Sequence, residues 1–414
     1  GETVKVSITM VKKTYATGRL LKIVTMAPNR IDASCDLYGF CGGCQLQHIT
    51  YEGQLSLKTQ KVKDVIERIG HQNPDLVKPT LGPKEPWAYR NKMQMPVGGT
   101  KGDILMGFYA MGSHDIVQGT NCPIQDEGNN IIAQACYQIA KELDVEPYDE
   151  HTGKGVLRHI IGRIGQSGWM VILVTATNNL PHQEKWVKNL TERVPQVETI
   201  VHNVNGKRTN VILGPKNRIL YGDGTITDHI KDLRFTLSPH SFFQVNPAQT
   251  TVLYDQALAY ADLKGDETVI DAYCGTGTIS LFLAHKAKHV IGIEIVEPAI
   301  INARENARRN GYDNTEFIVA DAAVEMPKLY KAGVRPDVIV FDPIRAGCKK
   351  EVLTSAAGME PKRIVYVSCN PATMARDIEI LTHYGYELQE VQPVDMFPMT
   401  AHVEAVALLT MVSA

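Results

Sequence analysis

The sequence contains no long hydrophobic run. Its longest apolar stretches, such as residues 403–412, reach only about half of the ~20 residues that a membrane-spanning helix requires. The chain also opens without the basic segment and apolar stretch of a secretion signal. These absences argue against a membrane protein, and we expect a soluble, cytoplasmic protein.

A large excess of charge of one sign is missing as well. The 43 Lys and Arg residues nearly balance the 45 Asp and Glu residues, which gives a net charge of −2. Within residues 1–100, however, 14 basic residues stand against 8 acidic ones. Such a local excess is typical of a surface that follows nucleic-acid phosphates, and an ordinary solvated face is the alternative.

Cysteine is scarce, with eight residues in a chain of 414. Disulfide frameworks belong to short secreted chains with small cores, so this class is excluded. Three of the cysteines nevertheless stand within ten residues, at positions 35, 41 and 44. This clustering favours a reducing compartment and a metal or cluster site.

The length allows about two or three domains, and 44% of the residues are hydrophobic. Residues 1–30 alternate apolar and polar side chains from the outset, which predicts part of a small β domain. Residues 31–225 predict an α+β central domain that contains the cysteine cluster. Residues 226–414 predict a Rossmann-like α/β domain.

Five short runs rich in Val and Ile alternate with helical segments in residues 226–414, a pattern that is typical of a parallel sheet wound in βαβ units. Ligands of such sheets bind at the carboxyl ends of the strands. The runs end in polar or reactive side chains, namely Asp271, Glu294, Asp321, Asp342 and Cys369. These five residues are therefore candidate site residues.

The segment DAYCGTGTISL, residues 271–281, reads as a loop that brings the backbone close to a nucleotide, because glycine has no side chain to block the approach. Glu294 follows at the end of the next strand, where it can accept hydrogen bonds from a ribose. The third glycine of a dinucleotide loop is missing, which favours the nucleoside of S-adenosylmethionine. Asp321 is a candidate for contact with the adenine, and a helix N-cap is its alternative role.

Cys369 is the candidate nucleophile. It ends a strand just before a helix, whose N-terminal dipole favours a thiolate. A thiolate that adds to C6 of a pyrimidine turns C5 into a nucleophile for a methyl donor, and a base must then remove the C5 proton. Glu404 is the candidate base and His402 the second choice, whereas Cys274 is expected to be a packing residue. An inert thiol at 369 and a solvated charge at 404 are the alternatives.

Taken together, these motifs resemble the family of RNA uracil-C5 methyltransferases that act on ribosomal or transfer RNA. The resemblance runs over essentially the whole chain and rests on residues 240–246 (HSFFQVN), 271–277 (DAYCGTG), 341–347 (FDPIRAG), 368–371 (SCNP) and 402–404 (HVE). It implies that Cys369 is the nucleophile and Glu404 the base. The residues it implies for S-adenosylmethionine are Gln244, Tyr273, Glu294 and Asp342.

The sequence departs from the family pattern at Ile344, where the family usually has a second proline after Asp342-Pro343. The rigidity of this loop is thereby in question. The resemblance also implies that residues 1–30 are the end of a TRAM domain, an oligonucleotide-binding type of barrel, with its first strands outside the sequence.

The cysteine spacing Cys35-x5-Cys41-x2-Cys44 predicts a site with four thiolate ligands. Cys122 is the fourth candidate, because it precedes a proline on a loop and the iron–sulfur members of the family pair these positions. We expect a [4Fe-4S] cluster; zinc is the alternative, since four thiolates also suit that metal. A third possibility is that the cysteines hold no metal.

The cysteine set and the barrel favour 23S ribosomal RNA as substrate, and transfer RNA is the alternative. A non-catalytic iron–sulfur RNA-binding protein is a hypothesis of a different class, with Ile344 as its main support. Methylation of an exocyclic amine is disfavoured because it needs no cysteine. A monomer is expected.

Overall fold

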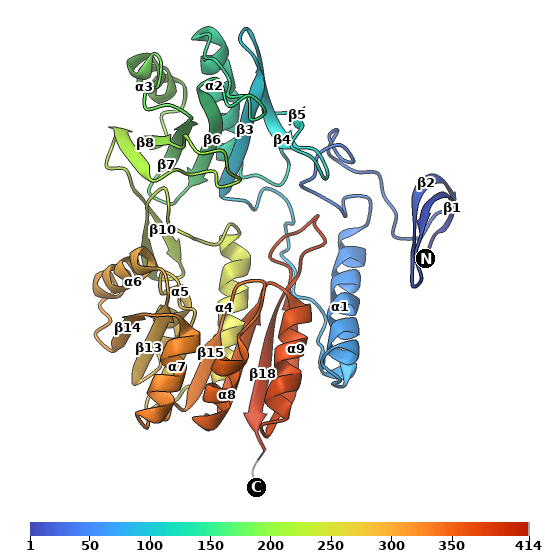
Figure 1. Ribbon diagram of the computed structural model, residues 1–414, viewed down its shortest axis with the longest axis vertical. Helices are drawn as coiled ribbons and strands as arrows, with labels where there is room; N and C mark the ends of the chain where they lie inside the picture. Colours follow the sequence, from blue (N-terminus) through green and yellow to red (C-terminus); the bar gives the residue numbers. More distant parts are fainter. Residues whose placement is uncertain (413–414) are drawn as a thin grey trace.

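Two seven-stranded sheets form the body of the chain and lie one above the other in the computed structural model, which describes residues 1–412 (Figure 1). The lower sheet has the order β14-β13-β12-β15-β16-β18-β17. Its first five strands are parallel, β18 runs antiparallel to them, and β17, which pairs antiparallel with β18, again runs in the direction of the first five. The predicted Rossmann-like α/β fold of the C-terminal part is therefore confirmed.

Helices cover both faces of the lower sheet, because strand residues alternate between two cores. One core includes α4, α5 and α6, and the other includes α7, α8, α9 and α1. The strands of this sheet are β12 (Thr268–Ala272), β13 (His289–Glu294), β14 (Thr315–Val319), β15 (Val338–Phe341), β16 (Arg363–Ser368), β17 (Tyr386–Val394) and β18 (Glu404–Met411). Its helices are α1 (Tyr51–Arg68), α4 (Pro247–Ala261), α5 (Thr278–Ala284), α6 (Glu297–Arg309), α7 (Ala322–Lys331), α8 (Lys350–Gly358) and α9 (Pro371–Thr382).

The upper sheet has the order β5-β4-β3-β6-β7-β8-β9, and helices α2 and α3 pack on one of its faces. Its strands are β3 (Lys92–Thr100), β4 (Asp103–Tyr109), β5 (Ile116–Gln118), β6 (Leu157–Ile164), β7 (Trp169–Thr175), β8 (Val197–Val204) and β9 (Lys216–Tyr221). The helices are α2 (Glu127–Glu142) and α3 (Gln183–Arg193). The opposite face shares a core with the hairpin of β10 (Ile226–Ile230) and β11 (Leu233–Leu237) and with the lower sheet, so the two halves are packed together.

Helix α1 lies early in the chain but packs on the lower sheet. Val62 and Ile66 are fully buried against α9, in the core that also contains Met374 and Ile378. The 3-10 helix η1 (Pro74–Leu76) follows it and leads past β17, where Val77 forms a bridge with Val391. Residues 51–77 thus reach the same region as the last two strands of the chain.

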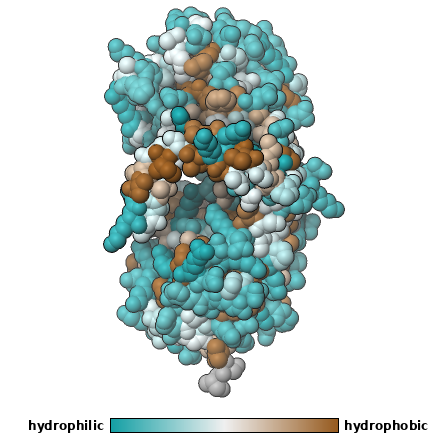
Figure 2. All heavy atoms as spheres, turned by 90° about the vertical axis from the view of Figure 1, so that its right-hand side faces the viewer, coloured by the Kyte–Doolittle hydropathy of each residue, from teal (hydrophilic) through white to brown (hydrophobic). Residues whose placement is uncertain are grey.

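Strands β1 (Thr3–Val11) and β2 (Ala16–Thr25) form a hairpin that stands beside the body of the chain (Figure 1). Figure 2 shows a band of hydrophobic side chains across the middle of this face, with a hollow beside it. The exposed apolar side chains of the hairpin include Val4, Val6, Ile8, Met10, Leu20, Leu21 and Val24. Two strands do not close a barrel, so the TRAM assignment stays a prediction. Across residues 1–412, no helix combines the length and apolar character needed to cross a membrane.

Candidate functional site

Three predicted site residues lie side by side at the carboxyl edge of the lower sheet. Strand β15 ends just before Asp342, β16 ends just before Cys369, and the antiparallel β18 begins with Glu404. Ser368 pairs with Ala405 in the β16–β18 ladder. Because paired strands lie about 4.8 Å apart, Cys369 and Glu404 are direct neighbours across this edge.

Glu404 has the electrostatic properties of a general base. Its side chain is 5% exposed, and burial raises its pKa to about 7, against the opposing charge of Arg345. A carboxyl group with such a pKa exchanges a proton readily at neutral pH. His402 lies at the surface, and partial burial and Arg345 lower its pKa. The geometry therefore favours Glu404 over His402 as the base beside Cys369.

The thiol of Cys369 differs from the sequence expectation. Helix α9 does begin beside it, but burial and the charges of Glu404 and Asp342 raise its pKa, and Arg345 only partly opposes them. Desolvation and two acidic neighbours outweigh a helix dipole, whose effect is about 1 kcal/mol. Burial and two acidic side chains therefore oppose the effect expected of the helix dipole, and the role of Cys369 as nucleophile stays a prediction.

The glycine loop after β12 leaves room for a ligand. A side chain at Gly275 would meet no atom within 4 Å, and this residue has a positive φ of +54°. The carboxylate of Glu294 accepts hydrogen bonds from the backbone nitrogens of Gly275 (3.3 Å) and Val296 (2.8 Å). The loop and the carboxylate are thus held together at the ends of two adjacent strands, as the sequence predicts.

A group of carboxyl side chains lies beneath this loop. Asp271 is fully buried, and its Oδ2 accepts a hydrogen bond of 2.5 Å from Ser280 while its Oδ1 has no partner among residues 1–412. Burial raises its pKa to about 7. Burial, Glu404 and Asp271 together raise the pKa of Asp342 well above its ordinary value. A positively charged ligand would relieve this mutual repulsion.

Tyr273 and Asp321 flank the same edge. Tyr273 adopts a left-handed φ of +77°, and its backbone nitrogen donates to the carbonyl of Ile293 at 2.9 Å. Asp321 accepts a hydrogen bond of 2.9 Å from the backbone of Ala323 at the start of α7 and pairs with Lys349 at 2.8 Å. The alternative role of Asp321 as a helix N-cap is therefore confirmed.

Gln244 lies half-buried in the segment between β11 and α4, and its side chain makes no hydrogen bond with the part of the chain that the structure describes. Its neighbours fix the segment in place. The carbonyl of Val245 accepts from the backbone of Asn91 at 2.9 Å, and the side chain of Asn246 donates to the carbonyl of Met396 at 3.1 Å. The segment thus joins the upper sheet to the loop before β18.

The loop that contains Ile344 is held without a second proline. Ile344 is 76% exposed, and its carbonyl accepts from the backbone of Gly347 at 2.9 Å. The carbonyl of Arg345 accepts from Asn370 (2.9 Å) and Thr373 (3.2 Å) of the neighbouring SCNP segment and α9. Sequence patterns alone do not single out Arg345, although its position in the motif at 341–347 is a signal that it belongs to the site.

The four predicted cysteine ligands gather beneath the upper sheet. Burial, together with the neighbouring thiols of Cys122, Cys41 and Cys35, raises the pKa of Cys44 to about 11. Cys44 and Cys122 also pack in one small apolar cluster with Met399. Within residues 1–412, no three potential ligands stand at the spacing of a formed metal site. The structure therefore brings the four thiols together but does not identify a metal.

Two basic residues on the face of the upper sheet opposite α2 and α3 are not identified from the sequence. Lys92 of β3 pairs directly with Arg163 of β6, although like charges opposite each other destabilise a sheet. Arg163 is 4% exposed, and neither residue forms an ion pair within residues 1–412. Burial, Arg163 and Arg90 lower the pKa of Lys92 to about 7. A basic residue within each predicted apolar strand is the signal that could have identified them.

Known proteins resemble the chain over most of its length. The family model of tRNA (uracil-5-)-methyltransferases matches residues 178–412. Two proteins described as uncharacterized RNA methyltransferases are similar throughout: one from Halalkalibacterium halodurans is 50% identical over 99% of this chain and 90% of that protein, and one from Bacillus cereus is 51% identical over 100% and 90%.

A solved structure agrees with these relatives. The tRNA (uracil-54, C5)-methyltransferase of Pyrococcus abyssi, in complex with S-adenosyl-L-homocysteine, superposes with a TM-score of 0.79 at 28% identity and covers 99% of this chain and 93% of that one. The resemblance stated from sequence motifs is confirmed. The chain belongs to the tRNA (uracil-5-)-methyltransferase family of S-adenosylmethionine-dependent RNA methyltransferases.

Proposed function

We propose that the protein methylates C5 of a uridine in 23S ribosomal RNA, with Cys369 as nucleophile and Glu404 as base. One observation carries this proposal: the β16–β18 register brings a thiol and a buried carboxyl group with a pKa of about 7 next to each other. A thiol alone has many structural explanations. A thiol beside a base, at the ligand edge of a methyltransferase sheet, matches the two chemical needs of methylation at a pyrimidine carbon.

The residues act in a defined order. The sulfur of Cys369 adds to C6 of the uracil, and the electron pair of the C5–C6 double bond makes C5 nucleophilic. C5 then takes a methyl group from S-adenosylmethionine. Glu404 removes the C5 proton, the C5–H electrons restore the double bond, and the C6–S bond breaks to release the thiolate. Arg345 opposes the acidic neighbours of the sulfur and so favours its ionised form.

The residues around the glycine loop fit a cationic nucleoside. The space over Gly275 admits a ligand close to the backbone, and the unpartnered Oδ1 of Asp271 marks an unsatisfied buried carboxyl oxygen. We assign Glu294 to the ribose and Asp342 to the cationic end. S-adenosylmethionine supplies a methyl group on a positively charged sulfur, and that charge would also lower the pKa of the neighbouring Cys369 thiol. The remaining family positions in this assignment are Gln244 and Tyr273, and Asp321, just after β14, is assigned to the adenine.

The face of the upper sheet opposite α2 and α3 supports contact with RNA where it is not covered by the lower half of the chain. Lys92, which is half-buried and has no carboxylate partner within residues 1–412, is a candidate for contact with a phosphate, whereas the buried Arg163 donates to the carbonyl of Ser241 beside it. On the same face, a pocket of about 410 Å³ is bordered by Gln94, His159 and Gly42. Gly42 belongs to the cysteine loop, residues 35–46, which contains Cys35, Cys41 and Cys44. The exposed side chain of Phe242 belongs to the segment that precedes Gln244 and offers a surface for stacking with a base. We also assign the β1–β2 hairpin to an RNA-binding barrel.

A substrate competition tests the function. The cysteine set supports ribosomal RNA, whereas the P. abyssi relative is described as acting on tRNA. Purified protein is incubated with S-adenosylmethionine and unmodified 23S rRNA or tRNA transcripts, and 5-methyluridine is quantified by mass spectrometry of the digested RNA. We expect one methyl group per modified uridine in 23S rRNA. Methylation of tRNA alone would show that tRNA, and not 23S rRNA, is the substrate. The absence of 5-methyluridine from both RNAs would refute the proposed function.

We infer that Cys35, Cys41, Cys44 and Cys122 hold a [4Fe-4S] cluster with a structural role, because transfer of a methyl group needs no electron. The five-residue gap between Cys35 and Cys41 suits a cluster better than the short ligand spacing of zinc knuckles. Protein purified without oxygen should be brown and contain iron and sulfide at about four each per chain. In Cys122→Ser we expect most of the iron to be lost, whereas the matched control Cys136→Ser should keep it. Stoichiometric zinc in colourless protein would contradict this assignment.

A further inference from the structure

Residues 395–403 form the loop between β17 and β18, and the base lies at its exit. Val394, the last residue of β17, pairs with Glu404, the first residue of β18. Asp395 therefore begins the loop next to the pair at which the loop closes. Any displacement of this loop changes the position of the Glu404 carboxyl group relative to Cys369.

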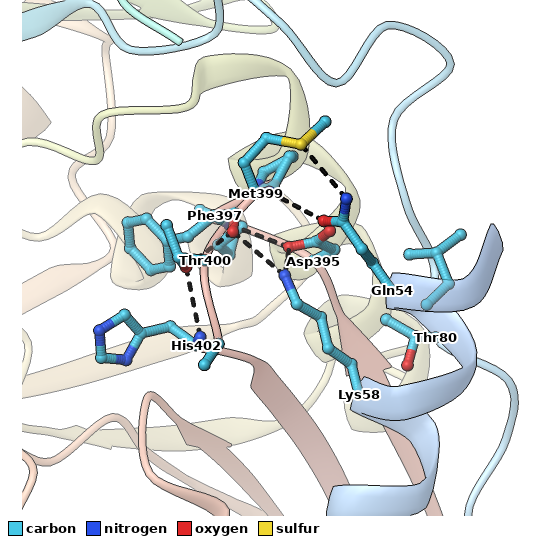
Figure 3. A network of polar contacts seen from close by, with 12 residues as sticks. Gln54, Lys58, Thr80, Asp395, Phe397, Met399, Thr400 and His402 are labelled. Atoms are coloured by element: carbon cyan, nitrogen blue, oxygen red, sulfur yellow. Dashed lines mark hydrogen bonds and ion pairs between the residues drawn. The ribbon is translucent and has the colours of Figure 1, made fainter. Parts of the chain in front are cut away.

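Helix α1 holds the beginning of this loop through a buried ion pair (Figure 3). The Nζ atom of Lys58 lies 2.6 Å from Oδ1 of Asp395 and donates to the carbonyl of Phe397 at 3.1 Å. The hydroxyl of Tyr51 donates to the other carboxylate oxygen of Asp395 at 3.0 Å. The ion pair is almost fully buried, with exposed fractions of 2% and 0% for the two side chains. Removing one partner of such a pair would leave a buried charge uncompensated, so the pair fixes the position of the two segments that it joins.

The middle of the loop is held at Met399, which has a left-handed φ of +68°. Its backbone nitrogen donates to Oε1 of Gln54 at 3.0 Å, and its carbonyl accepts from the backbones of Gln45 and Leu46, each at 3.0 Å (Figure 3 shows the Gln54 contact). A residue with a side chain keeps this conformation only where its surroundings impose it. Helix α1 and the cysteine loop together impose it here.

The same loop joins the cysteine site to the active site. The side chain of Met399 packs with Cys44, and the side chain of Gln45, the residue after this cysteine, accepts from the backbone of Ala401 at 3.2 Å. Lys61 of α1 donates to the carbonyl of Ala401 at 2.9 Å. Every step from the cysteine cluster to the residues before Glu404 is therefore a packed or hydrogen-bonded contact.

We propose that Gln54, Lys58 and Asp395 are positioning residues which, with the cysteine loop, clamp residues 395–403 and so place Glu404 for proton removal. This inference rests on the proposed function of Glu404. It gives the cysteine site a role in the last chemical step, exerted through Met399 and without electron transfer. Weakening the clamp slows removal of the C5 proton and leaves addition by Cys369 intact.

Gln54→Met tests the clamp, since it removes the hydrogen bonds to Met399 but retains side-chain volume. At saturating RNA and S-adenosylmethionine, we expect kcat to fall by about 10- to 100-fold, the range for a small misplacement of a catalytic group. The amount of covalent RNA adduct, measured on a denaturing gel, should increase as kcat falls. The KM for RNA should stay within about twofold of the wild-type value. Gln54→Glu keeps the acceptor for the Met399 nitrogen and should restore much of the activity. Thr80→Val, which removes a contact to Thr59 of the same helix, should leave adduct and kcat unchanged.

If Gln54→Met does not fold, two substitutions of lysines on α1 still test the clamp. Lys61→Met releases the carbonyl of Ala401, whereas Lys63→Met removes an equal charge from the same helix without touching the loop. More adduct in Lys61→Met than in Lys63→Met supports the clamp. Equal adduct in both variants overturns it.

Glu404→Gln, assayed in parallel, separates this inference from the proposed function. Suppose that Glu404→Gln accumulates the covalent RNA adduct, but Gln54→Met and Lys61→Met form no more adduct than their control variants. The clamp proposal is then wrong, and the assignment of Glu404 as the base is right. No adduct in Glu404→Gln means that the base assignment itself fails, and the clamp fails with it.

Discussion

Cys369→Ala is expected to abolish uridine methylation, with a loss on the order of 10⁴-fold or more, as for removal of other covalent nucleophiles. Cys274, the thiol of the glycine loop, is a poor substitute. Cys274 is 5% exposed, and its pKa is raised by burial and by Asp271 and Glu294. The measurement is 5-methyluridine formed per enzyme in a single-turnover reaction. S-adenosylmethionine binding, measured by calorimetry, should change little.

RNA that contains 5-fluorouridine allows the covalent bond between Cys369 and the uracil to be detected directly. Fluorine at C5 cannot leave as a proton, so the wild-type protein should stay attached to the RNA through Cys369. The variant should form no such complex, and Cys136→Ala, which alters a thiol inside α2, should form it normally. Methylation by Cys369→Ala at more than a trace level would show that the reaction needs no thiol and would remove the basis of the proposed mechanism.

Glu404→Gln is expected to stop the reaction one step later. Glutamine has a similar shape but cannot accept the C5 proton, so turnover should fall by about 10²- to 10⁴-fold while adduct with unmodified RNA accumulates. In the wild type, release of the adduct should quicken as the pH rises toward 7 and level off above it, because burial raises the pKa of Glu404 to about 7. His402→Gln is the matched control and should keep this profile. Free turnover by Glu404→Gln would exclude it as the base.

Glu404→Gln should also change the free energy of unfolding, and the raised pKa of Glu404 determines how this change depends on pH. The native state keeps the Glu404 proton up to a pH of about 7, whereas the unfolded chain releases it near pH 4.5. This contribution to stability is therefore complete below pH 4.5 and is lost as the pH rises to 7, by on the order of 3 kcal/mol. Thermal unfolding should show Glu404→Gln to be more stable than the wild type at pH 8, with the difference shrinking toward pH 4.5.

Sequence patterns predicted much of the lower sheet because its constraints are local. Each Val- and Ile-rich run was short, followed by a turn or a helix start, and ended in a polar residue; parallel winding then places all such ends at one edge. Asp342 and Cys369 therefore needed no tertiary information to be placed together. Glu404 needed more, because β18 is antiparallel and only its register shows that it begins where β16 ends.

The charge states and the clamp could not be predicted in this way. Lys58 stands at a spacing of four from Gln54 and Val62, on the buried face of α1, yet its sequence context reads as part of a lysine-rich solvated surface. Its partner Asp395 lies 337 residues further along the chain. A pairing over such a separation is set by the packing of α1 on α9, which no local pattern encodes.

The chemistry of the edge was determined by the sequence itself: which residue types end the strands, how the glycines are spaced, and that a thiol and a carboxylate are available. Tertiary structure alone decided their protonation, since desolvation and neighbouring charges raise the pKa of Cys369 where the helix dipole would lower it. The physical reason is that strand and loop patterns follow from short-range backbone and side-chain preferences, whereas a pKa depends on every charge and every water-excluding atom that the fold brings near.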